Sequence, residues 1–192
     1  MASEPYEILV GVGTLYIAPA TEVATALTAT PSGNWVSLGE TDGGVTVTKT
    51  QNIERFSSDQ RTGSVKAVRT EEGLMVETNL QEGTLEKLAY VINGTVTDTA
   101  PGAGTIGTRT LKLHKGFDVT QYSLIFRGSS PYGAFPGQFY VPVGIFVDDV
   151  GLEFTKDGKT LIPVKFEALE DPDASTEADR FGIITYQDAA AV

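Results

Sequence analysis

The stretch DGGVTVTKTQNIERFSSDQRTG, residues 42–63, begins as a half-buried β-strand and then continues past its apolar residues. Val45 and Val47 alternate with threonines, as in a strand with one face on a core. The same face then carries Lys49 and Gln51. An isolated two-stranded ribbon is marginally stable in water and exposes unpaired edges. The pattern therefore indicates a strand whose outer part is covered by a partner chain.

A polar hairpin arm is expected over about residues 46–65, mobile in the isolated protein and ordered on contact with a partner. Residues 49–72 carry five basic and four acidic side chains. Such a near balance favours a surface that meets another copy of the chain; the alternative is a solvated ribbon of mixed charge. The residues that we assign to the contact between subunits are Thr48, Lys49, Gln51, Ile53, Arg55, Phe56, Asp59 and Arg61.

The composition indicates one globular domain over residues 1–192, because 41% of the residues are hydrophobic and 20% are charged. The absence of cysteine excludes disulfides, thiolate metal sites and cysteine nucleophiles, and fits a reducing cytoplasm. The net charge of -11 disfavours binding to nucleic acid by phosphate neutralisation, although DNA can still pass nearby. We expect no membrane span, since no run of about 18 apolar residues occurs.

The N-terminal part predicts short strands separated by turns. Residues 8–12 alternate in hydrophobicity, and residues 15–17 continue the alternation after a bend at Gly13. Small and turn-forming residues fill positions 20–34, which indicates a loop. A short strand is expected at residues 35–38.

The second half of the chain carries the clearest strand, at residues 139–147. We expect a following strand at 150–154, a hairpin turn at KDGK (156–159) and a returning strand at 162–168. A C-terminal arm is expected over about residues 171–192. Several strands separated by Gly, Pro and Asp turns predict a mainly β fold, a sandwich or barrel-like domain with extended hairpin and terminal arms.

One amphipathic helix interrupts the β pattern and is expected over about residues 80–93. Asn79 and Glu82 have capping-box spacing, and Asn93 with Gly94 supplies a left-handed stop. We expect this helix to flank the β domain. Its apolar stripe at i, i+3, i+4 and i+7 consists of Leu85, Leu88, Ala89 and Ile92, of which Leu85, Leu88 and Ile92 are the expected packing residues.

Catalytic and metal sites are not indicated. The single histidine, His114, is expected at the surface, because Leu111 and Leu113 occupy the alternating positions that would be buried. Asp148 and Asp149 are adjacent on an expected strand and would point to opposite faces, which disfavours a shared metal. We therefore expect no enzymatic activity and no cofactor.

The order of these parts resembles the major tail tube proteins of long-tailed bacteriophages. The resemblance lies in LGETDGGVTVTKT (38–50), the polar hairpin, GLMVETNL (73–80) and the helix QEGTLEKLAYVI (81–92), and it covers roughly residues 35–95. Ring proteins of type VI secretion and of contractile tails share that fold. The resemblance implies a structural virion protein whose homo-hexameric rings stack into a tube for DNA ejection.

The same resemblance implies further partners and a location. These are the tape measure, tail terminator and baseplate proteins of a phage tail assembled in the host cytoplasm, with DNA passing through the lumen without specific binding and with no membrane. A negatively charged wall would repel phosphates, and Glu153 and Glu167 are the expected lumen-facing acids. The alternative function is a β-sandwich module for carbohydrate or protein binding and adhesion, for which Tyr132, Phe135, Phe139 and Tyr140 would form an exposed aromatic patch. The same four residues fit equally well as a loop buried between subunits.

Overall fold

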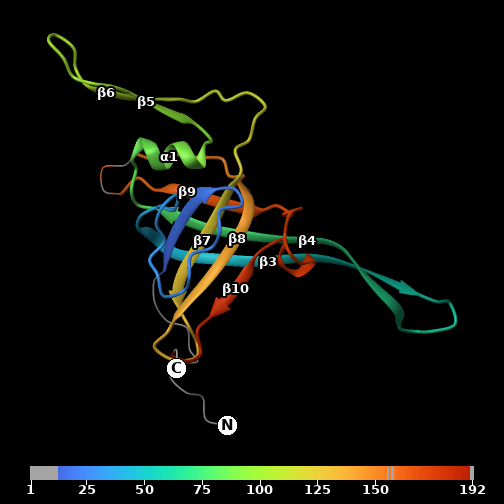
Figure 1. Ribbon diagram of the computed structural model, residues 1–192. Helices are drawn as coiled ribbons and strands as arrows, with labels where there is room; N and C mark the ends of the chain where they lie inside the picture. Colours follow the sequence, from blue (N-terminus) through green and yellow to red (C-terminus); the bar gives the residue numbers. More distant parts are fainter. Residues whose placement is uncertain (1–12, 155, 157, 191–192) are drawn as a thin grey trace.

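The computed structural model describes residues 13–154, 156 and 158–190 of the chain (Figure 1). The strands are β1 (Thr14–Pro19), β2 (Val36–Ser37), β3 (Thr41–Ser57), β4 (Ser64–Leu80), β5 (Thr95–Thr99), β6 (Thr108–Lys112), β7 (Tyr122–Ser129), β8 (Pro136–Phe146), β9 (Ile162–Ala168) and β10 (Ile183–Tyr186). The helices are α1 (Leu85–Val91) and the short 3-10 helix η2 (Glu177–Asp179).

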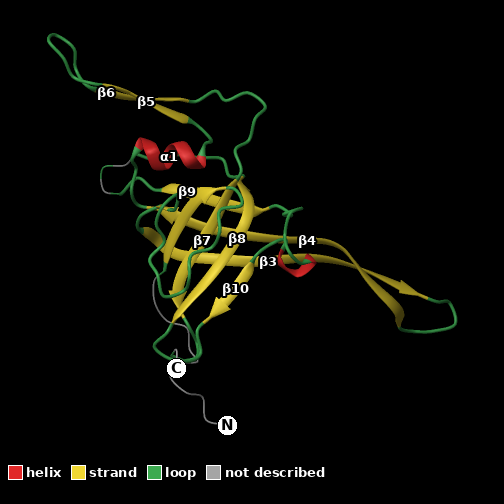
Figure 2. Cartoon of the chain, in the orientation of Figure 1, coloured by secondary structure: helices red, strands yellow, loops and turns green. Residues whose placement is uncertain are grey.

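The main sheet has eight antiparallel strands in the order β2-β1-β7-β8-β9-β4-β3, and β10 also pairs with β8. One edge of β8 is shared, because Gly144–Phe146 pairs with β9 and Gly137–Tyr140 pairs with β10. In Figure 2, strands β3, β4 and β9 run across β7 and β8, so the sheet folds over on itself. The predicted mainly β fold with one flanking helix is therefore confirmed.

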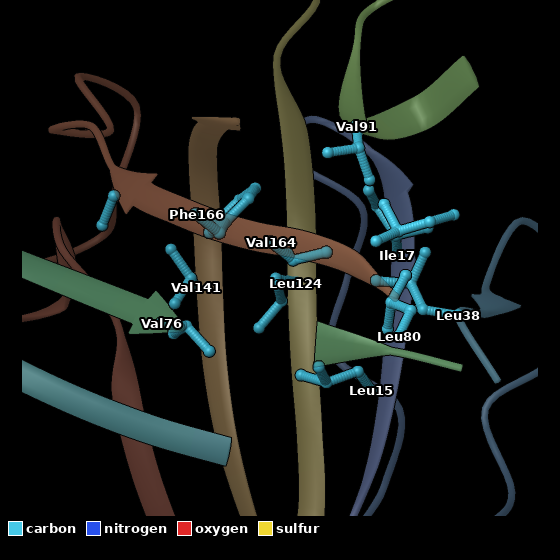
Figure 3. Close-up of a cluster of buried hydrophobic side chains, with 12 residues drawn as sticks. Leu15, Ile17, Leu38, Val76, Leu80, Val91, Leu124, Val141, Val164 and Phe166 are labelled. Atoms are coloured by element: carbon cyan, nitrogen blue, oxygen red, sulfur yellow. The ribbon is translucent and has the colours of Figure 1, made fainter. Parts of the chain in front are cut away.

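The hydrophobic core lies where the crossing strands face each other (Figure 3). Phe166 of β9 and Leu124 of β7 are both fully buried there. The sequence of β9 suits a strand with one buried face, because every second residue is apolar and enters the core. Those alternating buried residues are Ile162, Val164, Phe166 and Ala168.

The predicted strands have different outcomes. Residues 15–17 lie in β1 and 35–38 contain β2, whereas the predicted piece at 8–12 lies outside the described residues. The strand predicted at 150–154 is wrong: its described positions form no strand, and Phe154 is 82% exposed. The reason is that β9 already pairs with the end of β8, which leaves no partner for an intervening strand. The KDGK turn is only partly described.

Helix α1 begins later than predicted. The expected start near residue 80 is wrong, because Asn79 belongs to β4 and pairs there with Asp42 and Pro163. A residue held in a sheet cannot cap a helix that begins six positions later. The N-cap is Thr84, whose side chain makes no capping hydrogen bond.

The end of α1 matches the prediction. Asn93 has φ 57°, in the left-handed region, and its amide donates to Tyr90 O at 3.3 Å. The Gly94 amide donates to Ala89 O at 2.7 Å. These two bonds form a Schellman motif, which satisfies the last carbonyls of the helix and turns the chain away.

The C-terminal segment, predicted as an arm over about 171–192, lies against the body in its described part. The Asp171 amide donates to Arg180 O at 3.0 Å and closes the loop that carries η2. Strand β10 then joins the main sheet, with Ile183 opposite Tyr140 of β8. Strand pairing satisfies backbone groups that a free arm would expose.

Candidate functional site

The β3–β4 hairpin projects far beyond the rest of the sheet (Figure 1). The two strands pair from Thr41 opposite Leu80 to Ser57 opposite Ser64. Strand β9 borders β4 only between Met75 and Leu80, so the outer part has no further strand beside it in the described chain. We call residues 49–72 the β3–β4 arm. At about 3.3 Å per residue, it extends roughly 30 Å.

The face of the arm that continues the core turns polar where the arm begins. Directly opposed residues share a face of a strand pair. Val47 lies opposite Val76, which is buried, and both pack with the core. The next pairs on the same face place Lys49 opposite Leu74 and Gln51 opposite Glu72. The body therefore covers the apolar part of this face, and the polar part of the same face extends along the arm into solvent.

Two β-bulges change the register along the arm. Thr70 has no direct partner between the pairs Asn52–Glu71 and Ile53–Arg69, and Val65 is the extra residue nearer the turn. Bulges increase strand twist and re-aim side chains. The arm is thus shaped by specific irregularities as well as by its length.

The outer half of the arm carries exposed apolar side chains. Glu54 lies opposite Val68 and Phe56 opposite Lys66, which makes Phe56 and Val68 diagonal neighbours on the face away from the core. Phe56 is 49% exposed and Val68 is 40% exposed, and Val65 at the nearby bulge is 49% exposed. We call these three residues the arm-tip patch. Exposed apolar groups on a polar ribbon are typical of a contact surface.

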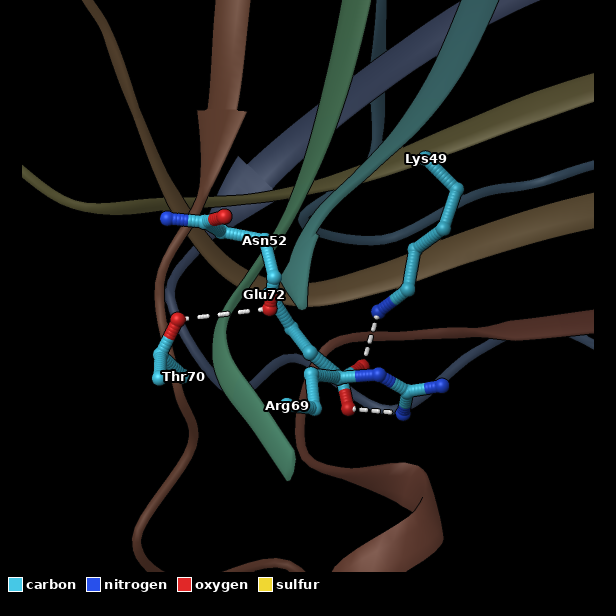
Figure 4. A network of polar contacts seen from close by, with 5 residues as sticks. All are labelled: Lys49, Asn52, Arg69, Thr70 and Glu72. Carbon is cyan, nitrogen blue, oxygen red and sulfur yellow. Dashed lines mark hydrogen bonds and ion pairs between the residues drawn. The ribbon is translucent and has the colours of Figure 1, made fainter. Parts of the chain in front are cut away.

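An ion-pair network holds the base of the arm (Figure 4). Lys49 Nζ lies 2.5 Å from Glu72 Oε2, and Arg69 forms a second ion pair with Glu72. The hydrogen bond from Lys49, followed by that from Arg69, lowers the pKa of the Glu72 carboxyl. Thr70 Oγ1 donates to Asn52 O at 3.3 Å across the bulge. The network links the two strands at the point where the neighbouring strand ends.

A cleft of about 1030 Å³ separates the arm base from the C-terminal segment. Its walls combine apolar side chains with charged ones at the rim. Lys49 Nζ lies 4.9 Å from the centroid of the Phe181 ring and bridges the two sides. The apolar lining residues include Val47, Leu74, Val76, Val141, Phe181 and Ile183, and the charged ones are Lys49, Arg69, Glu71, Glu72, Glu170, Glu177 and Arg180.

The predicted contact residues lie along the arm, except Thr48, which immediately precedes it. Ile53 is half-buried, and the others are exposed. Arg55, Asp59 and Arg61 make no ion pair with any residue that the structure describes. Sequence reasoning missed Val65 and Val68 in the returning strand, where the bulges break the alternation that would have marked them.

The two acids predicted to face a lumen lie on different elements. Glu167 is half-buried on β9, on the face opposite Phe166, and lies between Met75 of β4 and Ile145 of β8. Glu153 is exposed in the connection between β8 and β9, so its placement on a strand is wrong.

Helix α1 contacts the core mainly through its second half. Leu88 and Tyr90 pack against the core, and Val91 is buried within it at 4% exposure. Leu85 and Ile92 are half-buried. Sequence reasoning missed Val91, although its i, i+3 spacing from Leu88 was a usable signal.

The predicted aromatic patch is largely packed against the sheet. Phe139 contacts Tyr186 of β10, with ring centroids 6.1 Å apart, and the Tyr140 hydroxyl donates to Glu22 O at 2.8 Å. Burial raises the pKa of Tyr140. Tyr132 is the exposed member of the four. A flat aromatic platform for a sugar is therefore not formed by these residues.

His114 is exposed, as predicted, although the expected burial of Leu113 beside it is wrong, since that side chain is 79% exposed. No group of three or more His, Asp or Glu side chains that could hold a metal occurs among the described residues. No helix in the described part is long and apolar enough to cross a membrane.

Comparison with known proteins finds no matching family model and no matching curated protein. Among solved structures, the fold is similar to a chain in the cryo-EM structure of the anti-feeding prophage baseplate, 6-fold symmetrised, with a TM-score of 0.40 and 8% sequence identity. The alignment covers 98% of this chain and 95% of that chain. At this TM-score the similarity carries no conclusion about function.

Proposed function

We propose that this chain is the repeating subunit of a bacteriophage tail tube. Its copies form hexameric rings, the rings stack, and DNA leaves through the channel. The observation that carries the proposal is the β3–β4 arm, a paired ribbon that extends past β9 without cover from its own chain. Such a ribbon gains stability when a second copy contacts it, because isolated hairpins are marginal in water.

An unused strand edge supports association between copies of the chain. Strand β3 is the last strand of the sheet order, so its outer edge has no partner among the described strands over Thr41–Ser57. Natural proteins usually shorten, charge or cover such an edge. A head-to-tail contact made repeatedly by one chain closes into a ring or continues as a filament. A tube requires one contact that closes a ring and a second contact that repeats along the tube axis.

The charge distribution supports stacking of the arm on the body of the next ring. The β3–β4 arm carries five basic and four acidic residues, so it is net +1. The chain as a whole is -11, so the remainder is -12. Opposite potentials favour an arm-on-body contact over an arm-on-arm contact. The acidic remainder would also keep DNA phosphates from adhering to the wall.

The test is assembly of the purified chain, followed by sedimentation velocity and negative-stain microscopy. We expect rings or hollow tubes from the parent, and rings that fail to stack when residues 51–71 are replaced by a two-residue turn. Phe56→Ser should weaken stacking, whereas Val23→Ser removes an apolar side chain that is 80% exposed elsewhere and should not. A parent chain that stays monomeric at high concentration contradicts the proposal.

A further inference from the structure

A second projection leaves the body next to α1. Strands β5 and β6 form a separate two-stranded sheet, from Thr95 opposite Lys112 to Thr99 opposite Thr108 (Figure 1). It is tied to the helix, because Arg109 near the outer end of β6 pairs with Glu86 of α1, and the Asn93 side-chain amide at the end of α1 donates to Asp118 O at 2.8 Å. We call residues 95–121 the β5–β6 projection.

The β5–β6 projection exposes large apolar side chains. Leu113 is 79% exposed, and Phe117 is fully exposed. Ile106 and Val119 are also exposed. The two-stranded sheet is at best marginally stable in water, and another surface that covers the exposed apolar groups of its turn and of the segment after it would stabilise the projection.

The projection is also basic. It has three basic residues, Arg109, Lys112 and Lys115, and two acidic residues, Asp98 and Asp118. Arg109 is paired with Glu86 and Asp98, but Lys112 and Lys115 make no ion pair with any described residue. Two cations thus lie beside the exposed apolar groups without a partner in the described chain.

The segment after β8 has the complementary chemistry. Residues 147–154 expose Leu152 at 36% and Phe154 at 82%, with Val147 also exposed. The acids of this segment make no ion pair with any residue in the described part of the chain. They are Asp148, Asp149 and Glu153.

Both surfaces leave the body at the same end. The ring of Tyr90 in α1 meets the ring of Tyr122 edge to face with centroids 5.8 Å apart, and the Tyr122 ring lies tilted against Phe146 at the same separation. The 147–154 segment therefore begins beside the helix that carries the projection. In a ring, the projection of one copy and the 147–154 segment of the next copy would then lie at the same height along the ring axis.

We propose that the β5–β6 projection of one copy packs on residues 147–154 of the neighbouring copy within a ring. Apolar groups meet apolar groups, and Lys112 and Lys115 meet the acids. The contact is head-to-tail, so repeated rotation closes it into a ring. This inference rests on the proposed tube and assigns its lateral contact, distinct from the stacking contact of the β3–β4 arm.

Disulfide cross-linking tests the contact directly, because the chain has no cysteine. A chain carrying Leu113→Cys and Leu152→Cys should give, after mild oxidation of assembled protein, a ladder of covalent oligomers up to the size of the ring. The two single variants mixed should give only dimers. The control pair, Leu113→Cys with Val23→Cys, should give neither. An intrachain disulfide, or no product above the control, overturns the inference.

Charge reversal gives an independent readout. Lys112→Glu with Lys115→Glu should weaken lateral association by roughly tenfold, and Asp148→Lys with Asp149→Lys should do the same. An equimolar mixture of the two double variants should associate more strongly than either alone, because each copy can then meet an opposite charge. Thermal melts check that each variant is folded. Unchanged association of the folded variants overturns the inference.

The two proposals fail in different ways. A parent chain that remains monomeric overturns both the tube and its lateral contact. Rings that form normally but give no Leu113–Leu152 cross-link overturn the lateral assignment alone. Rings that do not stack but still give the Leu113–Leu152 cross-link support the lateral contact. In that case only the stacking role of the β3–β4 arm is overturned.

Discussion

Lys49 of β3 and Glu72 of β4 form an ion pair, with Nζ 2.5 Å from Oε2, at the position where the arm leaves the body. The same ammonium lies over the ring of Phe181. One side chain thus connects both strands of the arm to the C-terminal segment. We infer that this junction sets the direction in which the arm points.

The first prediction concerns acid. The pKa of Glu72 is lowered in the folded chain below its ordinary value of 4.5. The ion pairs are therefore fully present above about pH 4.5, and they are lost as the pH falls through the lowered pKa.

Removing the Glu72 charge tests the same network at neutral pH. We expect Glu72→Gln to accelerate amide exchange in the arm at neutral pH and to leave the melting temperature almost unchanged, since the network is exposed. Carboxyl NMR titration checks the sign: a Glu72 pKa above 4.5 contradicts it.

The second prediction concerns order in the β3–β4 arm. Few apolar contacts hold its outer half, so its amides should exchange quickly in the isolated protein. In assembled tubes the same amides should be protected by the next ring. Hydrogen exchange with mass spectrometry before and after assembly measures both states. Equal protection in the two states would remove the main support for the stacking role.

The third prediction concerns a close approach in the core. A Cβ added at Gly144 would lie 2.4 Å from a ring carbon of Phe166 and 2.6 Å from the backbone oxygen of Glu167. The ring can shift, but the paired backbone of β9 cannot. Gly144→Ala should therefore cost roughly 1–3 kcal/mol of unfolding free energy. Gly63→Ala is the matched control, because its Cβ would meet nothing within 4 Å. Denaturant unfolding with equal midpoints for both variants would contradict the prediction.

The fourth prediction concerns α1. Leu88→Ala removes a side chain that packs against the core and should cost about 2 kcal/mol, the lower end of the usual range, because Leu88 is only partly buried. Leu85→Ala removes a side chain of the same size that lies outside the core cluster and should cost less. Thermal melts of both variants measure the difference. If Leu88→Ala melts like the parent, the helix does not support the fold.

The sequence predicts those elements whose two faces differ. Strand β9 alternates buried and half-buried residues along its whole length, so its pattern was readable. Strand β7 buries Ser123, Leu124 and Ile125 in succession, which removes the period-two signal, and no strand was predicted there. Asn93 marked the end of α1 correctly, because a left-handed residue is a local requirement.

Misleading alternation explains the errors. Leu111 and Leu113 alternate as if one face were buried, but Leu111 lies in a separate two-stranded sheet and Leu113 follows the end of that sheet and is 79% exposed. Leu152 and Phe154 alternate in the same way without a strand partner. Alternation reports that a face is apolar, and it does not report which surface covers that face. At these positions we propose that the cover comes from another copy.

The fifth prediction concerns the channel wall. Glu167 and Lys165 lie on the outer face of β9, where Lys165 pairs with Glu77 at 3.2 Å and Glu167 has no ion-pair partner among the described residues. If this face lines the lumen, Glu167→Gln should leave tube assembly unchanged, because a half-exposed carboxylate without a partner contributes little to stability.

Glu167→Lys should change the behaviour of the tube toward DNA. Each ring would place several new cations beside the passing duplex, and each neutralised phosphate releases counterions, so the tube should retain DNA most strongly at low salt. Glu153→Lys tests the second predicted lumen acid, and Asp173→Lys makes the same charge change on an exposed C-terminal site. Pelleting tubes with short duplexes across a salt series measures retention. If the Glu167→Lys tubes form normally and retain no more DNA than the Asp173→Lys tubes, the outer face of β9 does not line the channel.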